Sequence, residues 1–106
     1  MKTHKKHDDW LLEQLKDPGF AADYLTAAAE DEFPQVYLAA LRKVAEARGM
    51  AEVALRAGIP RESLYRALSP KGNPRWSTLA AIVRATGLKI EMGRTGVRDH
   101  ERNEAA

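Results

Sequence analysis

Five side chains that can hydrogen-bond to nucleic acid are spaced along one expected helix near the middle of the sequence. These residues are Arg61, Glu62, Tyr65, Arg66 and Ser69. Arginine can bind guanine through two parallel N–H bonds, hydroxyl groups reach phosphates, and a carboxylate accepts from cytosine. Lys71 and Arg75 follow in a loop and could hold the phosphate backbone. The pattern predicts a surface that binds double-stranded DNA.

The residues around this surface have the spacing of two short helices joined by a tight turn. The first helix, about 50–57, carries the small residue Ala54 where the second helix must cross it. Gly58 tolerates the positive φ that the turn needs, and Ile59 can fill the core between the helices. The second helix, about 60–68, would lie in the major groove with its N-terminal end toward the base edges. Its inward side carries Leu64, Ala67 and Leu68. The alternative interpretation is an ordinary helical hairpin with a solvated basic face.

Helical signals continue on both sides of this pair. The expected helices, about six and all short, cover residues 8–16, 20–30, 34–48, 50–57, 60–68 and 77–86. Asp8 or Asp9 can cap the first helix and Ser77 the last. Pro34 suits the first position of the third helix, and Gly49 can end it. The fold class is therefore predicted to be all-α, a helical bundle that contains a helix-turn-helix.

One segment near the C-terminus departs from the helical pattern. Residues 88–92 alternate apolar and polar side chains, which predicts a short C-terminal β-strand. A single strand leaves its backbone unpaired, so it must pack as an extended tail or pair with a second copy of the chain. We expect one helix-turn-helix domain over 8–92, with an N-terminal helical extension (8–48) and a DNA-binding core (49–92). The segments expected to be flexible are the basic N-terminus, residues 1–7, and the tail, residues 93–106.

Composition narrows the function further. The 106 residues have a formal net charge of +2 and no cysteine, which excludes disulfides, thiolate nucleophiles and sulfur-ligated zinc. No apolar run approaches the roughly 18 residues of a membrane helix, and no apolar signal core follows the basic N-terminus, so we expect a cytoplasmic protein. His4 and His7 lie beside two lysines, so metal binding is not expected. No nucleophile, base and acid are arranged for catalysis, so we expect neither an enzyme nor a cofactor.

The two halves of the sequence carry opposite charge. Residues 8–46 contain nine acidic and three basic residues, a net of −6, whereas residues 50–98 contain nine basic and three acidic residues, a net of +6. Such a separation suggests two different contact surfaces, and solvated helix faces are the alternative. A basic partner would complement the acidic half. The acids considered for this contact are Asp8, Asp9, Asp31 and Glu32, but helix capping explains Asp8, Asp9 and Asp31 equally well.

Three stretches have a more specific pattern: GMAEVA (49–54), GIPRESLYRALS (58–69) and GNP (72–74). Together they resemble the HigA-type addiction-module antidote (antitoxin) family, whose members have a Cro/repressor-type helix-turn-helix. Weaker similarity extends this resemblance over roughly Trp10 to Met92. The sequence departs from the family at Pro60, where a serine cap is common, and the tail after residue 92 matches nothing recognisable.

The resemblance implies an antitoxin that represses its own operon and neutralises a small basic RelE/HigB-like toxin, an mRNA-cleaving ribonuclease. One DNA-binding module binds weakly, so we expect a homodimer on a palindromic operator. From the residue types, the expected contacts are guanine or phosphate for Arg61 and Arg66, phosphate or thymine for Tyr65 and Ser69, and the DNA backbone for Lys71 and Arg75. Two alternatives stay open: a stand-alone Cro/repressor-type transcriptional regulator without a toxin, and a protein-interaction module that never touches DNA.

Overall fold

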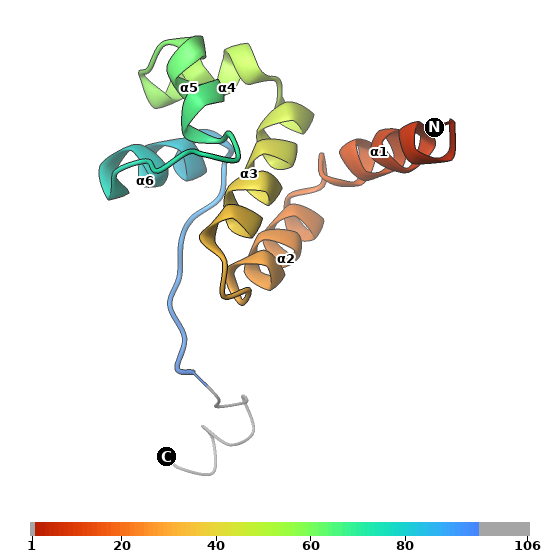
Figure 1. Ribbon diagram of the computed structural model, residues 1–106, viewed down its shortest axis with the longest axis horizontal. Helices are drawn as coiled ribbons and strands as arrows, with labels where there is room; N and C mark the ends of the chain where they lie inside the picture. Colours follow the sequence, from red (N-terminus) through yellow and green to blue (C-terminus); the bar gives the residue numbers. More distant parts are fainter. Residues whose placement is uncertain (1, 96–106) are drawn as a thin grey trace.

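Six helices make up the computed structural model, which describes residues 2–95, and one of them, α3, lies at its centre (Figure 1). In chain order they are α1 (Lys2–Gln14), α2 (Pro18–Ala29), α3 (Pro34–Arg48), α4 (Met50–Ala57), α5 (Arg61–Ala67) and α6 (Trp76–Ala85). Helix α2 packs along α3, and α4 joins α3, α5 and α6. The expected all-α class is therefore confirmed for the described part of the chain.

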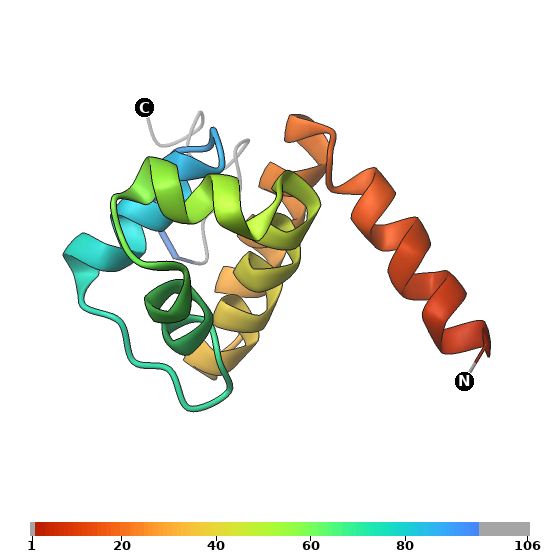
Figure 2. The same ribbon diagram turned by 90° about the horizontal axis from the view of Figure 1, so that it is seen from above.

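The core forms where α3 meets α2 on one side and α4, α5 and α6 on the other. Its fully buried side chains are Leu15, Leu41, Val44, Val53, Leu64, Leu68, Ile82 and Val83. Burial of aliphatic side chains of this size contributes about 1.5–3 kcal/mol each, which makes this cluster the main stabilising element. Helix α1 contacts α3 but extends away from the rest of the chain (Figure 2). No helix among residues 2–95 has the length and apolar character needed to cross a membrane.

Helix boundaries follow the proline and glycine signals closely. Pro34 is the first residue of α3, and Gly49 ends that helix with a φ of 104°. Asp17 caps α2, because its Oδ2 accepts a hydrogen bond from the Phe20 N–H at 2.8 Å. A cap of this kind is typically worth about 1 kcal/mol.

Two expected caps are wrong. Helix α1 begins at Lys2, so Asp8 and Asp9 lie inside it, and Asp8 instead pairs with Lys43 at 3.9 Å. The lysines before Asp8 are good helix formers, so the helix can continue through them. Helix α6 begins at Trp76 after the extended residue Arg75, which places Ser77 in the first turn and not at the cap. The exposed N-terminus of α6 can bond to water, so it needs no capping side chain.

The expected C-terminal strand is not confirmed, since no strand forms within residues 2–95. Residues 88–94 leave α6 as an extended tail that runs away from α4 and α5 (blue in Figure 1). A β-strand requires a neighbouring strand for its hydrogen bonds, and a single chain of helices offers none. Most of the tail predicted to be flexible, residues 96–106, lies outside the described residues, as does the side chain of His4.

Candidate nucleic-acid interface

The turn between α4 and α5 has the geometry that the sequence predicts. Gly58 lies in the left-handed region with a φ of 74°, and the Ile59 N–H donates to the Ala54 carbonyl at 3.1 Å. Ala54 is buried, which lets α5 approach α4 closely. Pro60 precedes α5 in an extended conformation and provides no side-chain cap. The turn therefore fixes the direction of α5 through backbone geometry alone.

Burial of one side of α5 places its polar residues on the other side. Leu64 and Leu68 are almost inaccessible to solvent, and both belong to the core. Arg61, Glu62 and Arg66 are exposed. Helical periodicity accounts for Glu62 and Arg66, which are four positions apart and share the face away from Leu64. Arg61 is three positions before Leu64 and is exposed at the first position of the helix. The helix thus presents two arginines and one glutamate to solvent from a rigid support.

Tyr65 lies between the exposed and the buried sides of α5 and contacts two arginines. The Arg61 guanidinium carbon lies 5.8 Å from the centre of the Tyr65 ring, and that of Arg42 lies 5.4 Å from it. A guanidinium over an aromatic face is attracted by the ring quadrupole. Arg42 comes from α3, and its Nε also donates to Glu46 at 3.4 Å. Sequence analysis missed Arg42, because helical periodicity relates residues within one helix and not across two.

The loop after α5 folds back onto the end of that helix. The Ser69 hydroxyl donates to the Arg66 carbonyl at 2.8 Å, so its proton is already used within the chain. The Gly72 N–H donates to the Ser69 carbonyl, also at 2.8 Å. In this geometry Ser69 can accept a hydrogen bond from a ligand but has no free O–H to donate to a phosphate.

Gly72 touches the last turn of α5 so closely that no side chain fits there. A Cβ at this position would lie 2.1 Å from the Ala67 carbonyl oxygen and 3.0 Å from the Arg66 carbonyl oxygen. The φ of Gly72 is not in the left-handed region, so the requirement is for space and not for an unusual backbone conformation. Gly72 therefore holds the loop against α5 and positions Lys71, which is exposed.

The site residues predicted from the sequence thus fall into two groups. Arg61, Tyr65, Arg66 and Ser69 are joined through contacts on or at the end of α5, and Glu62 lies on the exposed side of the same helix. Lys71 is in the following loop, and Arg75 immediately precedes α6; both are exposed. This arrangement can bind a polyanion through several cationic groups. Within the described residues no group of three or more histidine, aspartate or glutamate side chains could hold a metal ion.

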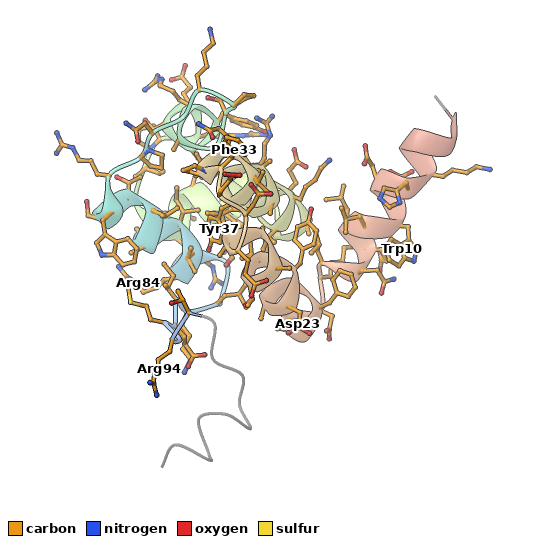
Figure 3. All side chains as sticks on the ribbon, turned by 60° about the horizontal axis from the view of Figure 1, so that its bottom comes forward. Trp10, Asp23, Phe33, Tyr37, Arg84 and Arg94 are labelled. Carbon is orange, nitrogen blue, oxygen red and sulfur yellow. The ribbon has the colours of Figure 1, made fainter. Side chains whose placement is uncertain are left out.

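The acidic half of the sequence occupies a different part of the fold. Figure 3 shows Trp10 and Asp23 on the side of α1 and α2, and Arg84 and Arg94 on the side of α6 and the tail. Asp31 does not provide a side-chain cap for α3. Its Oδ1 accepts from the Phe33 N–H at 2.9 Å, in the turn before that helix. Asp23 and the two arginines Arg84 and Arg94 thus lie on different sides of the fold.

Two tyrosines near the acidic half titrate unusually. Burial raises the pKa of Tyr37 above its ordinary value of 10.0. Burial also raises the pKa of Tyr24, and the negative charge of Asp8 adds to that rise. Both phenols therefore stay protonated to higher pH in the folded chain than in the unfolded chain.

Comparison with known proteins adds independent information. Residues 6–94 match a family described as "Probable addiction module antidote protein". An uncharacterized protein of Haemophilus influenzae is 35% identical over 91 residues, an alignment that covers 77% of this chain and 94% of the relative. No solved structure matches the chain.

Proposed function

The chain belongs to the family of probable addiction module antidote proteins, and we propose that it is an antitoxin that represses its own operon by binding operator DNA through α4 and α5. The antidote family implies a toxin partner of some kind. The observation that carries the DNA-binding proposal is the pair of exposed arginines on α5. Arg66 lies on the face away from the buried residue Leu64, and Arg61 is exposed at the first position of the helix. A rigid helix with this division is suited to enter the major groove.

Each polar side chain of the candidate site has a distinct role in this proposal. Arg61 and Arg66 bind guanine or phosphate, and a bidentate arginine–guanine pair discriminates against other bases by about 1–3 kcal/mol. Glu62 accepts from cytosine, while Tyr65 contacts phosphate or the thymine edge. Lys71 and Arg75 lie beyond the helix and contact the DNA backbone. The Ser69 hydroxyl donates to the Arg66 carbonyl, so Ser69 contacts the thymine edge and not a phosphate. Contact between Arg42 and Tyr65 supports the tyrosine from behind and adds one further positive charge near the DNA.

A single module with so few base contacts gives low affinity, so we propose that a two-fold dimer binds a palindromic operator. The repeat of the half-sites would then match the two-fold symmetry of the dimer. This symmetry predicts that one chain binds each half-site, with a spacing of about one helical turn of DNA.

Titration of a duplex from the region upstream of its own gene tests the DNA proposal. The double variant R61A/R66A should bind this duplex about 30-fold or more weakly, because two base-reading contacts are lost. The matched control K16A/R84A removes the same charge from two exposed residues outside α4, α5 and the C-terminal tail. The control should keep most of the preference for this duplex over a scrambled one. Equal losses in both double variants would mean that the chain binds DNA only through net charge.

For the toxin partner we propose a small basic RelE/HigB-like ribonuclease that contacts α1 and α2. A protein that grips RNA must carry positive charge around its active site, and the acidic half of this chain is complementary to it. Trp10 is 52% exposed and makes an edge-to-face contact with Phe20, with ring centroids 6.1 Å apart. An exposed tryptophan held by a neighbouring ring is a typical anchor at a protein interface.

Capture of the protein encoded beside this chain, co-expressed from the same locus, tests the toxin contact. Trp10→Ala should reduce the captured amount at least about 10-fold, as loss of an interface anchor does. Leu55→Ala is the control, because Leu55 is 77% exposed on α4 and also loses a large apolar side chain. Capture that is unchanged in the Trp10 variant would remove α1 from the interface. DNA binding by the same variant reports whether the fold is intact.

A further inference from the structure

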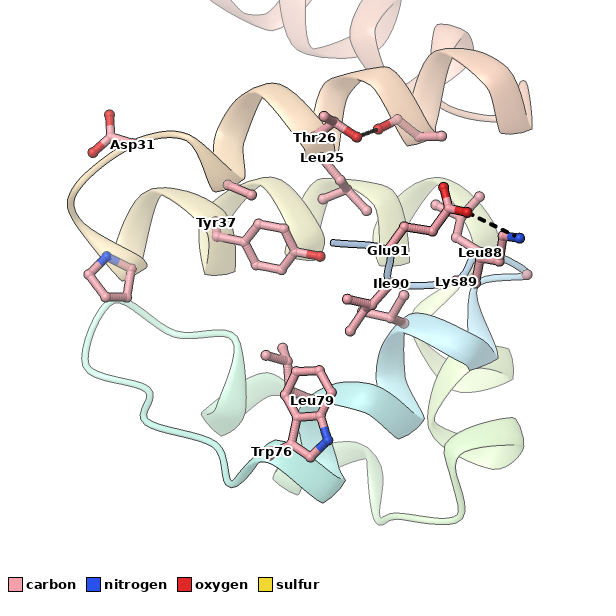
Figure 4. Close-up of a pocket in the computed structure, with 15 residues that line it drawn as sticks. Leu25, Thr26, Asp31, Tyr37, Trp76, Leu79, Leu88, Lys89, Ile90 and Glu91 are labelled. Carbon is pink, nitrogen blue, oxygen red and sulfur yellow. Dashed lines mark hydrogen bonds and ion pairs between the residues drawn. The ribbon is translucent and has the colours of Figure 1, made fainter. Parts of the chain in front are cut away.

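An apolar groove lies between α2, α3 and α6, and the first part of the C-terminal tail forms its remaining edge (Figure 4). The groove has a volume of about 820 Å³, and the residues that matter here are Leu25, Tyr37, Leu79, Leu88 and Ile90. Trp76 also lines it and is 62% exposed. An open apolar surface of this size on a small chain marks an interaction site.

The tail beside the groove has an unpaired backbone. Within residues 2–95 no hydrogen bond joins the backbone of residues 88–94 to another backbone group. Lys89 and Glu91 form an ion pair at 3.3 Å and are both largely exposed. Leu88, Ile90 and Met92 alternate with them, and Ile90 and Met92 are 38% and 92% exposed. The tail is therefore an extended segment whose backbone groups and apolar side chains could pair with a strand of another chain.

The order of residues in the tail is self-complementary about Ile90. If two tails pair antiparallel with Ile90 opposite Ile90, then Lys89 of each copy lies opposite Glu91 of the other. In the same register Leu88 lies opposite Met92. Opposite charges and apolar pairs at facing positions stabilise antiparallel strands, whereas like charges there destabilise them.

We propose that the occupant of this groove is a second copy of the chain, with the two tails paired antiparallel about Ile90. Met92 of each copy then packs beside Leu88 at the groove of the other, and Trp76 is covered. The seam lies away from α5 in Figure 1, so α5 of both copies stays uncovered. This proposal rests on the proposed function for its two-fold dimer, and it identifies the surface that forms it.

The apolar side chains of the tail and the order of its charges favour a second copy over other occupants of the groove. The chain's own last segment, residues 96–106, has Val97 and two terminal alanines as its only apolar side chains, so it matches the apolar groove poorly. An unrelated partner would need an apolar strand with its own charges in the opposite order. A second copy supplies both through symmetry alone.

Single cysteine substitutions test which residues of the two paired tails lie opposite each other, because the chain has no cysteine of its own. Residues directly opposite in an antiparallel pair have Cα atoms about 4.5–5.5 Å apart, within the range of a disulfide. Ile90→Cys should therefore form a covalent dimer under mild oxidation. In the control Met92→Cys the two cysteines would be about 13 Å apart along the strands and should not cross-link. Met92 is the more exposed residue, so random collision would give the reverse order.

Charge reversal tests the same seam without a covalent bond. Lys89→Glu should weaken the dimer about 5- to 30-fold, because it creates two symmetric pairs of like charge. The double variant K89E/E91K should restore the dimer. The control Lys16→Glu breaks an exposed ion pair with Glu13 elsewhere and should leave the dimer unchanged. Light scattering after gel filtration, in the absence of DNA, measures the mass of each variant.

The expected result is a wild-type mass of twice one chain, lowered by K89E and restored by the double variant. A monomeric wild-type chain would overturn the proposal and leave the groove to another protein or to a small apolar molecule. A dimer that K89E does not weaken, or that cross-links faster at Met92→Cys, would place the seam elsewhere and also overturn it. A dimer of the expected register that fails to bind DNA would refute the proposed function and keep this seam.

Discussion

Replacement of Gly72 by alanine tests how firmly the loop after α5 is held. The added Cβ would lie 2.1 Å from the Ala67 carbonyl oxygen and 2.8 Å from its carbon, both backbone atoms. Since Cβ contacts below 3.0 Å essentially never occur, the loop or the end of α5 must move by about 1 Å. Overpacking of this kind costs about 1–3 kcal/mol. For a domain of this size each kcal/mol lowers Tm by about 4–8 °C, so we expect a fall of about 4–24 °C.

The matched control is Gly93→Ala, because a Cβ there meets no atom within 4 Å and the φ is not in the left-handed region. Both variants reduce the backbone entropy of the unfolded chain equally, so their difference isolates the clash. Thermal unfolding followed by far-UV circular dichroism measures both. A Tm for Gly72→Ala within about 1 °C of the control would refute the close packing of the loop on α5.

Three further predictions concern the helix cap, the half-buried phenol of Tyr37 and the DNA contacts. Asp17→Ala should lower the free energy of unfolding by about 1 kcal/mol in chemical denaturation, because the Phe20 N–H loses its acceptor, whereas Asp17→Asn keeps an acceptor and should cost less. Burial raises the pKa of Tyr37 in the folded chain, so the stability it contributes is complete below pH 10.0 and is lost as the pH rises toward the folded pKa. Denaturation between neutral and strongly alkaline pH should therefore show a smaller alkaline loss in Tyr37→Phe, and an equal loss would contradict this assignment. Lys71→Ala should weaken binding to specific and scrambled duplexes alike and reduce the slope of log affinity against log salt by about 1 per lost phosphate contact. A loss confined to the specific duplex would mean that Lys71 reads bases.

Local signals in the sequence were sufficient for most of the helical part of the fold. Pro34 begins α3, Gly49 ends it and Gly58 forms the turn before α5, because each of these residues restricts or permits a particular backbone conformation by itself. The start of α1 could not be predicted from such local signals. A helix can begin without a capping side chain, so Asp8 and Asp9 gave a false boundary inside it.

The candidate site could be predicted only within α5. The periodicity of that helix correctly places Leu64 inside and Arg66 outside, whereas Arg61, three positions before Leu64, is exposed at the start of the helix. The contact of Arg42 with Tyr65 and the approach of Gly72 to α5 depend on how separate segments pack. Alternation in residues 88–92 indicates an extended chain, but whether it becomes a strand depends on a partner that one sequence does not contain.

The proposed antitoxin function is tested most directly in cells that express the gene adjacent to this one. Our account predicts that the neighbouring protein alone arrests growth and that co-expression of this chain restores it. It also predicts that the two proteins purify together in fixed proportion and that the isolated partner cleaves RNA. A neighbour that causes no arrest, or an arrest that this chain does not relieve, would contradict the account and indicate a stand-alone regulator.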